Sequence, residues 1–596
     1  MLLMFLFLMN NDSLPVDSVT VDSLTADSLL VYEVPEIIHF YPCDTATPYT
    51  IACMTKTNVF TGYDQSLTDY FFITPLTLHI YGIGQLSMIA QRGQNPEHTA
   101  LFLNGHRLSN PLFGYFNTVV LPVQFFESMS IGGDAMTSSS QSINFTSKIN
   151  RYDKPFSYVN YTFGNFGNSM YNIDFTRPIT NDIGFYLSAL YQKFDGYSEH
   201  DDFQMTSFYT NWYYNQILPT RFDIVYFSND YGLPNSPVDT LYGRGKETFV
   251  DASFVAGLNN HRVAVYYSMN ENDYSEPFAH TSLIKNYGVH TRSNHVVHDF
   301  IVRYGCMAQR STIKSDLLGP HNINGCALWL QVEKSFKRFF LTVANRGEWI
   351  SNHDILYLPQ IIFGLDIYDS TYVTGAVSRH FRTPSIVETY ESNSIPYPYY
   401  PIQGNNDLLP EYYWIQELGI RKKNSFVINF YKYDFTNRIV TQLDDEGFYI
   451  PQNIESWQTI GVEGYLEVPF YVRRHGDGNS LTEISAGCSG NYLFKGDSLY
   501  LVPKDVSSLY LTLRRLTERF SFSALIKERF IGIRHDVSGQ TLNSFSLFSI
   551  AGTIKFITLS CTLTLDNILD ESYDYIPNYS MPPRSFALSI KWEFWD

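Results

Sequence analysis

The chain approaches its C-terminus on Phe586-Ala587-Leu588-Ser589-Ile590-Lys591-Trp592-Glu593-Phe594, where large apolar residues alternate with small or charged ones. Successive side chains of a β-strand point to opposite faces, so this period of two predicts a strand with one apolar and one polar face. A transmembrane barrel needs that division, because one face meets lipid and the other meets the lumen. Residues 222–228 alternate similarly, and the aromatic-rich stretch 185–194 is compatible with a strand.

The composition also indicates a protein that meets both lipid and water. The chain has 596 residues, of which 45 are Tyr and 45 are Phe. Only 17% are charged, against about 25% in a typical soluble protein. A membrane-spanning helix needs about 20 consecutive apolar residues, and the longest apolar run is residues 1–9. If the chain crosses a membrane, it must therefore do so as a closed barrel.

Strand-like texture continues from about residue 151 to residue 596, with Gly, Asn, Asp and Pro clusters between short segments. A β-propeller would show a repeat of about 40–50 residues, which is absent, and a β-sandwich rarely needs so long a region. A barrel of about 22 antiparallel strands would have roughly 20 residues per strand and connection, which fits strands of about 10 residues. The fold class that we predict is an all-β transmembrane barrel of about 22 antiparallel strands over 151–596.

The sequence before the barrel region indicates three segments: a signal-like segment, a linker and a small domain. Residues 1–10 resemble the apolar core of a secretory signal, although the first basic residue of the chain is Lys56. Residues 11–32 repeat Asp-Ser every five residues, and such an acidic, Ser-rich segment predicts a flexible linker. Residues 33–150 contain Gly clusters and short apolar runs without strong helical periodicity. They predict a small α+β domain.

Motifs along the chain occur in the order that is typical of one family. In the N-terminal domain they are Gln91-Arg92-Gly93, Leu101-Phe102-Leu103-Asn104-Gly105 and Glu127-Ser128-Met129-Ser130-Ile131-Gly132-Gly133. Asn-Gly is itself a strong type I′ turn signal. In the barrel region they are Phe381-Arg382-Thr383-Pro384-Ser385, Gly404-Asn405-Asn406-Asp407-Leu408-Leu409-Pro410-Glu411, Gly461-Val462-Glu463 and Asp566-Asn567-Ile568-Leu569-Asp570. On these motifs the chain resembles the TonB-dependent outer-membrane receptors, from about residue 33 to the end.

The resemblance implies a barrel that lies in the outer membrane of a Gram-negative-type bacterium, with residues 33–150 as a plug in its lumen. It implies a monomer that contacts outer-membrane lipid and binds a scarce nutrient outside, such as a metal chelate or cobalamin. A TonB-type periplasmic energy-coupling protein would then drive import into the periplasm. One alternative is a plugged barrel with an adhesion or structural role that has lost energy coupling, and a second is a secreted binding protein without a membrane.

The resemblance also implies roles for particular residues. Those assigned to the plug core and gating are Arg92, Gly93, Asn104, Gly105, Glu127 and Gly132. We expect Arg92 to pair with barrel carboxylates, and ligand contact is the alternative for this residue. A patch behind the linker would be captured by the periplasmic partner as an added strand, or would form the first plug strand; it consists of Leu29, Leu30, Val31, Tyr32, Glu33 and Val34.

A Pro-rich stretch between 384 and 411 belongs on the extracellular side by resemblance. Exposed tyrosines on such a loop suit ligand capture, and an interfacial aromatic girdle is the alternative. The tyrosines concerned are Tyr390, Tyr397, Tyr399 and Tyr400.

Sequence motifs of common enzymes are absent: there is no Gly-x-Ser-x-Gly, no His-Glu-x-x-His and no phosphate loop. We predict no enzymatic activity, no catalytic or metal-site residues and no resident cofactor. The acidic loop Glu199-His200-Asp201-Asp202 could hold calcium or be simply solvated. The net charge of −18 argues against nucleic acid as a partner. Cys43 with Cys53, and Cys306 with Cys326, could form disulfides in an oxidising compartment or stay free.

Overall fold

The computed structural model describes residues 37–595, with gaps in that range. The positions left out are 42–49, 58–66, 133–140, 150–153, 181, 217, 234–242, 259, 276–278, 352, 369–370, 391–395, 398–399, 423–424, 446–447, 475–479, 518, 537–538 and 578. The segments expected at 1–10, 11–32 and 29–34, and the domain boundary expected at 150, therefore lie outside the described residues. No helix among the described residues is both long enough and apolar enough to span a membrane.

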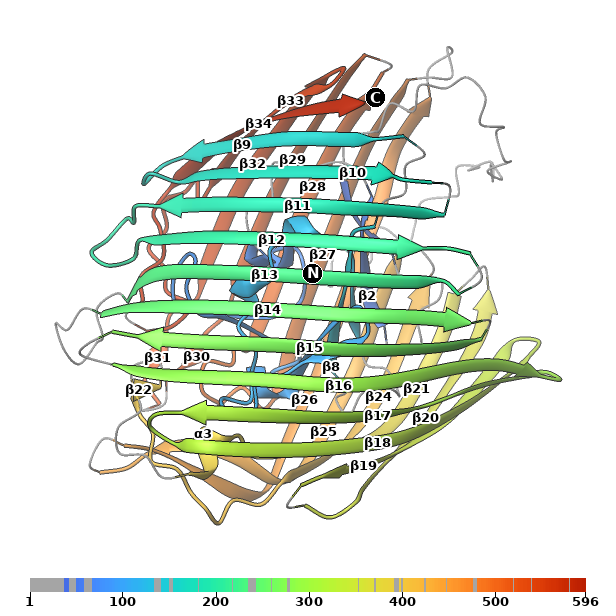
Figure 1. Cartoon of the computed structure of the whole chain (residues 1–596), viewed down its shortest axis with the longest axis vertical. Helices are drawn as coiled ribbons and strands as arrows, with labels where there is room; N and C mark the ends of the chain where they lie inside the picture. Colours follow the sequence, from blue (N-terminus) through green and yellow to red (C-terminus); the bar gives the residue numbers. More distant parts are fainter. Residues whose placement is uncertain are drawn as a thin grey trace. The chain divides into compact units, whose positions relative to one another are not determined.

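In the described part of the chain, 22 antiparallel strands close into a barrel, in which the last strand, β34, pairs with the first, β9 (Figure 1). This confirms the predicted fold class. The first eleven strands are β9 Phe156–Gly164, β10 Ser169–Pro178, β11 Ile183–Phe194, β12 Phe203–Tyr214, β13 Thr220–Leu233, β14 Gly243–Leu258, β15 His261–Tyr274, β16 His280–Val297, β17 Phe300–Ser315, β18 Gly319–Phe336 and β19 Phe339–Ile350. The others are β20 Leu356–Tyr368, β21 Thr371–Arg382, β24 Glu411–Lys422, β25 Phe426–Leu443, β26 Tyr449–Arg474, β27 Leu481–Lys495, β28 Asp505–Leu516, β29 Phe520–Ile531, β32 Phe545–Phe556, β33 Leu559–Asp566 and β34 Ser585–Trp595.

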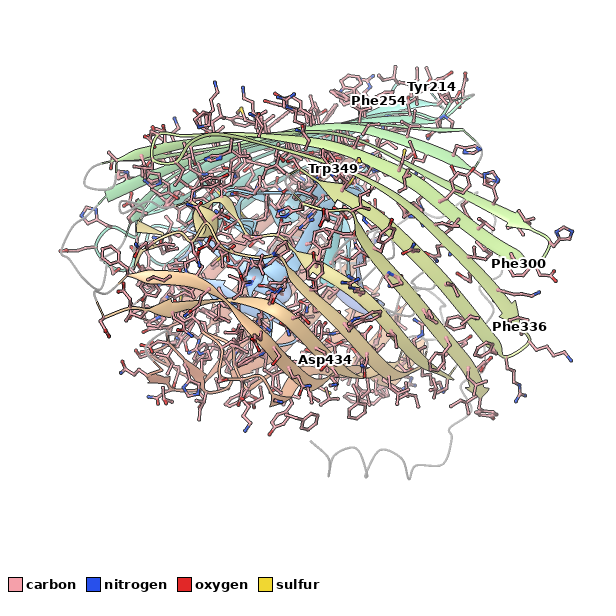
Figure 2. The ribbon with its side chains drawn as sticks, turned by 90° about the horizontal axis from the view of Figure 1, so that it is seen from below. Tyr214, Phe254, Phe300, Phe336, Trp349 and Asp434 are labelled. Atoms are coloured by element: carbon pink, nitrogen blue, oxygen red, sulfur yellow. The ribbon has the colours of Figure 1, made fainter. Side chains whose placement is uncertain are left out.

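The alternation noted in the C-terminal stretch divides the two faces of β34. Trp592 is 54% exposed, whereas Ser589, on the other face, is 2% exposed. Large apolar side chains such as Phe254, Trp349 and Phe336 are exposed on other strands (Figure 2). In a soluble protein so much exposed apolar surface would be costly. Facing lipid, it stabilises the barrel in its membrane.

The N-terminal domain lies inside this barrel and is built around a mixed sheet. Six described strands follow the order β1-β2-β7-β8-β5-β6, in which β5 and β8 are parallel. They are β1 Ile37–Tyr41, β2 Thr50–Thr57, β5 Thr99–Leu103, β6 His106–Leu108, β7 Phe126–Gly132 and β8 Gln141–Ser147. A separate hairpin and short helices complete the plug: α2 Leu67–Phe71, β3 Thr77–Ile80, β4 Ser87–Ala90, η1 Pro96–His98, η2 Thr118–Val120 and η3 Val123–Phe125.

The two ends of the barrel differ in the length of their connections. At one end β16 and β17, and likewise β18 and β19, are joined by two residues. At the other end, 383–410 contains α3 Ile386–Thr389 and the pair β22 Pro396–Tyr397 and β23 Tyr400–Pro401. The connection 532–544 at that end contains β30 Arg534–His535 and β31 Thr541–Leu542. Because outer-membrane barrels have short periplasmic turns and longer extracellular loops, the long-loop end is extracellular.

The cysteines of the barrel are not joined. Among the described residues the thiols of Cys306, Cys326, Cys488 and Cys561 are free, and Cys306 and Cys326 are exposed. The structure therefore takes the unpaired alternative for Cys306 and Cys326. The disulfide expected between Cys43 and Cys53 stays a prediction, because Cys43 and the side chain of Cys53 lie outside the described residues.

A charge on the lipid face should weaken the barrel. Leu328 lies midway along β18 and is 70% exposed. We expect Leu328→Arg to lower the free energy of folding into vesicles by about 2–4 kcal/mol, the usual cost of Arg near the middle of a bilayer. Urea titration of the folded barrel measures this, with Leu328→Phe as the matched control. Equal stability of the two variants would contradict the assignment of this face to lipid.

Candidate functional site

The plug meets the barrel wall at a tight turn between β4 and η1. Arg92 and Gly93 have φ values of 51° and 68°, so two successive residues adopt the left-handed conformation. A Cβ atom at Gly93 would lie only 2.6 Å from Cδ1 of Leu493 on β27. Glycine is therefore needed both for the turn and for the close approach to the wall. This explains the Arg-Gly step that the sequence singled out.

The Arg92 side chain is 4% exposed and reaches two glutamates of the barrel. Its Nε donates to Oε1 of Glu463 at 2.6 Å, Nη1 pairs with Glu417, and Nη1 also donates to the Tyr433 hydroxyl at 3.2 Å. The guanidinium lies over the Tyr431 ring, 5.1 Å from its centroid. Burial alone would lower the pKa of Arg92, but the two carboxylates raise it well above its ordinary value. Arg92 is thus a permanent cation between plug and wall; its role in gating stays a prediction.

A second charged cluster lies nearer the extracellular end, where the barrel motifs meet. Arg382, the last residue of β21, donates to Glu388 at 2.9 and 3.0 Å and to Glu411 at 2.9 and 3.1 Å. Ser385 and Glu388 form a capping box that begins α3. The Arg-x-Pro motif and the Leu-x-Pro-Glu motif, 29 residues apart at Arg382 and Glu411, therefore form one ionic unit.

This unit also holds the plug. Oε2 of Glu411 lies 2.7 Å from Nε2 of His98 at the end of η1. The backbone N–H groups of Ile386 and Val387 donate to the carbonyl oxygens of Pro111 and Leu112 at 3.1 and 3.0 Å. The extracellular loop that contains α3 is therefore bonded to the plug directly at Pro111 and Leu112, and His98 contacts the same ionic unit through Glu411 at the start of β24. Sequence reasoning matched Arg382 and Glu411 to family motifs but missed His98, because nothing in the sequence marks its partner.

Glu97 lies beside this unit and has a raised pKa. Burial raises the pKa of the Glu97 carboxyl from its ordinary value to about 7, and Glu388 and Glu411 add to the rise while Arg382 opposes it. Burial also lowers the pKa of His98, although Glu411 acts in the other direction. The plug thus places one titratable carboxyl next to the charges that hold the α3 loop.

Extracellular loops cover part of the plug apex. Tyr81 packs edge-to-face on Tyr579 of the connection before β34, with ring centroids 5.0 Å apart. Tyr115 of the plug and Leu501 of the connection 496–504 belong to the same apolar cluster. A ligand that reaches the apex here has to displace these side chains or enter beside them.

The periplasmic side of the plug is held by the predicted Asn-Gly turn. Asn104 and Gly105 have φ values of 52° and 94°, as a type I′ turn requires. Nδ2 of Asn104 donates to Oγ of Ser147 at 2.8 Å. Glu127 and Gly132 lie at the two ends of β7. The structure therefore does not gather the six residues assigned to the plug core and gating into one cluster.

The tyrosines expected to capture ligand are placed only in part. Tyr390 is 40% exposed and packs on His321, with ring centroids 4.3 Å apart. Tyr397 and Tyr400 are paired across β22 and β23. Tyr399 lies outside the described residues. Ligand contact by these residues stays a prediction.

Two aspartates of the acidic loop at 199–202 form hydrogen bonds or ion pairs within the protein. Asp201 accepts hydrogen bonds from the backbone N–H groups of Tyr197 and Ser198 at 3.2 and 3.0 Å. Asp202 pairs with Arg244 at 3.0 Å. Among the described residues no group of three or more His, Cys, Asp or Glu side chains could hold a metal ion. Calcium in an extracellular loop stays a prediction.

Arg529 of β29 forms a contact with the plug that sequence reasoning missed. Its guanidinium donates to the carbonyl oxygens of Phe71, Phe72 and Thr74 at 3.0, 2.7 and 3.1 Å, and also to that of Leu76. Ser508 adds a hydrogen bond to the Phe72 carbonyl at 2.6 Å. The segment after α2 is thus anchored through its main chain, which no side-chain motif could have revealed.

Comparison with known proteins agrees with this architecture. Residues 131–568 match the family model described as TonB dependent receptor-like, beta-barrel. A curated relative, the vitamin B12 transporter BtuB of Vibrio vulnificus (strain YJ016), is 25% identical over 221 residues, 35% of this chain and 32% of the relative. The match thus spans about a third of that relative's length.

Solved structures share the fold at low sequence identity. The siderophore receptor PirA from Pseudomonas aeruginosa has a TM-score of 0.70 and 16% identity, with 92% of this chain and 100% of that chain covered. The copper transporter OprC has a TM-score of 0.74 and 13% identity, with 94% and 100% covered. At such identities the likeness shows the fold alone.

Reversing the charge of Arg92 should loosen the plug. Arg92→Glu leaves Glu417 and Glu463 buried without their cation, and breaking a buried pair in this way costs on the order of 3–5 kcal/mol. We expect a lower thermal midpoint and new channel openings in planar bilayers. In the charge-free control Arg92→Met/Glu417→Gln/Glu463→Gln, the thermal midpoint should rise again towards that of wild type and the channel openings should become rarer. Wild-type conductance together with wild-type stability in Arg92→Glu would refute the pairing role.

Glu97 should make stability depend on pH. Its folded-state pKa of about 7 lies above the ordinary 4.5, so its stabilising contribution is complete below pH 4.5 and is lost as pH rises through 7. The free energy of unfolding of Glu97→Gln, relative to that of wild type, should therefore rise by about 1–3 kcal/mol between pH 5 and pH 8. Chemical unfolding at both pH values measures this, with the exposed Glu199→Gln as control. A gain that does not depend on pH would contradict the assignment.

Proposed function

The chain belongs to the TonB-dependent receptors, and from this premise we propose that it binds a scarce small-molecule nutrient outside the cell and imports it into the periplasm. Family membership makes it an outer-membrane receptor and not an enzyme. The proposal adds the import step and a metal chelate, cobalamin or similar compound as cargo. It also takes the protein to be a monomer in outer-membrane lipid, with no nucleic-acid partner.

The observation that carries the proposal is the charged contact between plug and wall. The lumen of the barrel contains a folded domain, so cargo can pass only if that domain moves or rearranges. Buried ion pairs such as Arg92 with Glu417 and Glu463 contribute little net stability, although leaving one partner alone is costly. An interface of this kind holds the plug in one position. Opening it would cost less free energy than opening a wholly apolar interface.

The edge of the plug sheet supports a pulling mechanism. β1 is the edge strand of the order β1-β2-β7-β8-β5-β6 and pairs only with β2 among the described strands. A TonB-type partner that captured residues 29–34 as an added strand would pull on the chain just before β1. Detaching an edge strand breaks one ladder of hydrogen bonds and leaves the rest of the sheet paired. The pull would thus reach the plug at an edge strand of its sheet.

The role of residues 29–34 can be tested by deletion. Cells that lack their own receptors and express the chain are supplied with radiolabelled cyanocobalamin, ferric enterobactin or cupric ion, and surface binding and uptake are measured separately. We expect uptake of one compound, and an at least tenfold slower uptake with unchanged binding when 29–34 are removed. Removal of six linker residues, 20–25, is the matched control. Uptake that survives the first deletion would favour the adhesion or structural role without energy coupling.

A further inference from the structure

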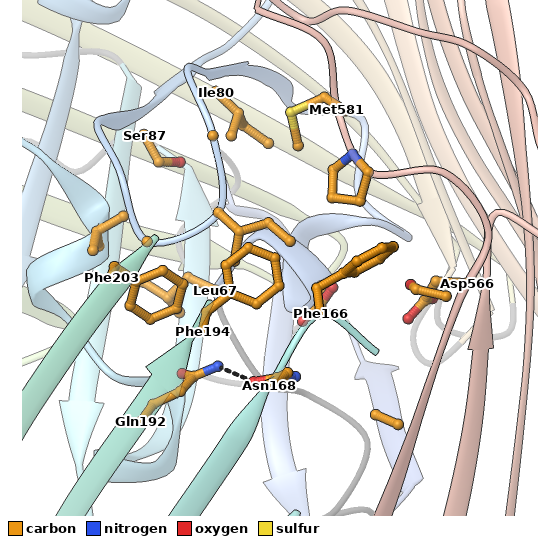
Figure 3. A pocket seen from close by; sticks show the side chains of 18 of the residues that line it. Leu67, Ile80, Ser87, Phe166, Asn168, Gln192, Phe194, Phe203, Asp566 and Met581 are labelled. Carbon is orange, nitrogen blue, oxygen red and sulfur yellow. Dashed lines mark hydrogen bonds between the residues drawn. The ribbon is translucent and has the colours of Figure 1, made fainter. Parts of the chain in front are cut away.

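Hollows occur on both faces of the barrel wall in the described part of the chain. One, of about 200 Å³, lies inside, between plug residues such as Ile80 and wall residues such as Phe203 (Figure 3). Another, of about 630 Å³, lies on the outer face and extends across the strands from β13 to β17. A hollow on the outer face cannot be filled from the lumen. Its occupant has to come from the membrane.

The outer hollow is apolar and is bordered by aromatic side chains. Ala252 of β14 and Ala308 of β17 contribute only methyl groups to its lining. Phe254 and Tyr287 lie beside them on the outer face and are 46% and 43% exposed (Figure 2). The ring of Tyr287 packs on that of Tyr267, with centroids 5.2 Å apart. Because small residues between large ones leave a groove, an acyl chain can make more contacts here than on a flat surface.

Arg310 lies where the outer face of β17 changes from apolar to polar. This strand begins at Phe300, at the short-turn end, and runs towards the extracellular end. The outward residues of the neighbouring strands change in the same way, on β15 from Met269 to Glu271 and on β18 from Cys326 to Asn324. Arg310 is the register partner of Tyr287, and tyrosines are enriched at the membrane–water interface. The hollow therefore opens beside the extracellular headgroup region.

Two lysines lie next to Arg310 on the outer face. In the register, Lys285 of β16 lies diagonally between Arg310 and Lys314 of β17. Diagonal neighbours of this kind are about 7–8 Å apart, within reach of long side chains. Among the described residues none of these three basic side chains forms an ion pair or a hydrogen bond. They are thus free to hold an anion together.

The carboxylates of this region do not pair with the three cations. Glu271 of β15 faces outward opposite Leu283, and Asp273 of the same strand is the register partner of Lys246 on β14. Asp316, beyond the end of β17, accepts a hydrogen bond from the backbone N–H of Thr281 at 2.7 Å. The cluster of Lys285, Arg310 and Lys314 therefore keeps an attraction for anions.

We propose that this part of the outer face binds a phosphorylated lipid of the outer leaflet. One acyl chain would lie in the hollow over Ala252 and Ala308. Arg310, Lys285 and Lys314 would hold a phosphate of the headgroup, because Arg binds phosphate through parallel N–H donors and basic clusters at a membrane surface attract anionic headgroups. The inference goes beyond the import proposed above and does not depend on it.

Native mass spectrometry on the purified full-length chain in detergent tests the site, with diphosphorylated lipid A as the probe. We expect saturable binding of lipid A and much weaker binding of phosphatidylcholine, whose phosphate is neutralised by its own choline group. Lys285→Gln/Arg310→Gln/Lys314→Gln should weaken lipid A binding by about tenfold or more. Ala308→Trp should weaken it as well, because the indole fills the hollow and leaves the three charges in place.

A matched control removes the same charge elsewhere. Arg292→Gln/Lys337→Gln/Arg338→Gln changes three exposed residues towards the short-turn end, and this variant should bind lipid A as wild type does. Heat-modifiable migration in gel electrophoresis checks that each variant forms the barrel. If the first triple variant does not, the comparison of the two lipids on the wild-type chain and on Ala308→Trp still decides.

Several results would overturn the inference. These are no saturable binding of lipid A, equal binding of phosphatidylcholine, equal losses in the two triple variants, or wild-type binding in both the first triple variant and Ala308→Trp. Tighter binding of phosphatidylglycerol than of lipid A would overturn the assignment to a lipid of the outer leaflet.

Discussion

The whole structure depends on the need to pair every backbone N–H and C=O group inside a bilayer. The pairing of β34 with β9 meets that need, because it removes the two free edges that a sheet of 22 strands would otherwise expose. Closure has a consequence for the lumen. A barrel of this size encloses a wide space, and the N-terminal domain occupies it. The plug is therefore the counterpart of the closed wall, and its contacts with the wall decide whether anything can pass.

Those contacts include an apolar cluster and two ionic ones, and the two ionic contacts lie at different depths in the barrel. Arg92 joins the plug to β24 and β26 through Glu417 and Glu463, while His98 joins it through Glu411 to Arg382 and the α3 loop. The first contact lies deep in the lumen, and the second lies under a loop that faces the outside. A change in the α3 loop would therefore act on the same charges that fix the plug, because the capping box and the ionic unit share Glu388.

The sequence alone was enough to predict the barrel and the lipid-facing side of β34, because alternation is a local property that the chain displays directly. The strand number followed from the length of the strand-rich region. The sequence also indicated the Asn104-Gly105 turn, since few residues tolerate positive φ. For the charge clusters, the sequence indicated one member and not its partners. Arg92 stood out, but Glu417, Glu463 and His98 come from distant parts of the chain, and only the strand register brings them together. The anchor at Arg529 was invisible for another reason, since its acceptors are carbonyl oxygens that carry no sequence signature.

That anchor bears on how the protein can diverge. Arg529 binds main-chain oxygen atoms of residues 71–76, and every amino acid supplies such an atom. The side chains of this segment can therefore be exchanged over evolutionary time without weakening the attachment. The arginine has no such freedom, because a lysine offers a single point of charge where several acceptors require a planar fork of donors. We infer that the wall can stay constant at this position while the segment that it holds drifts to suit a new cargo.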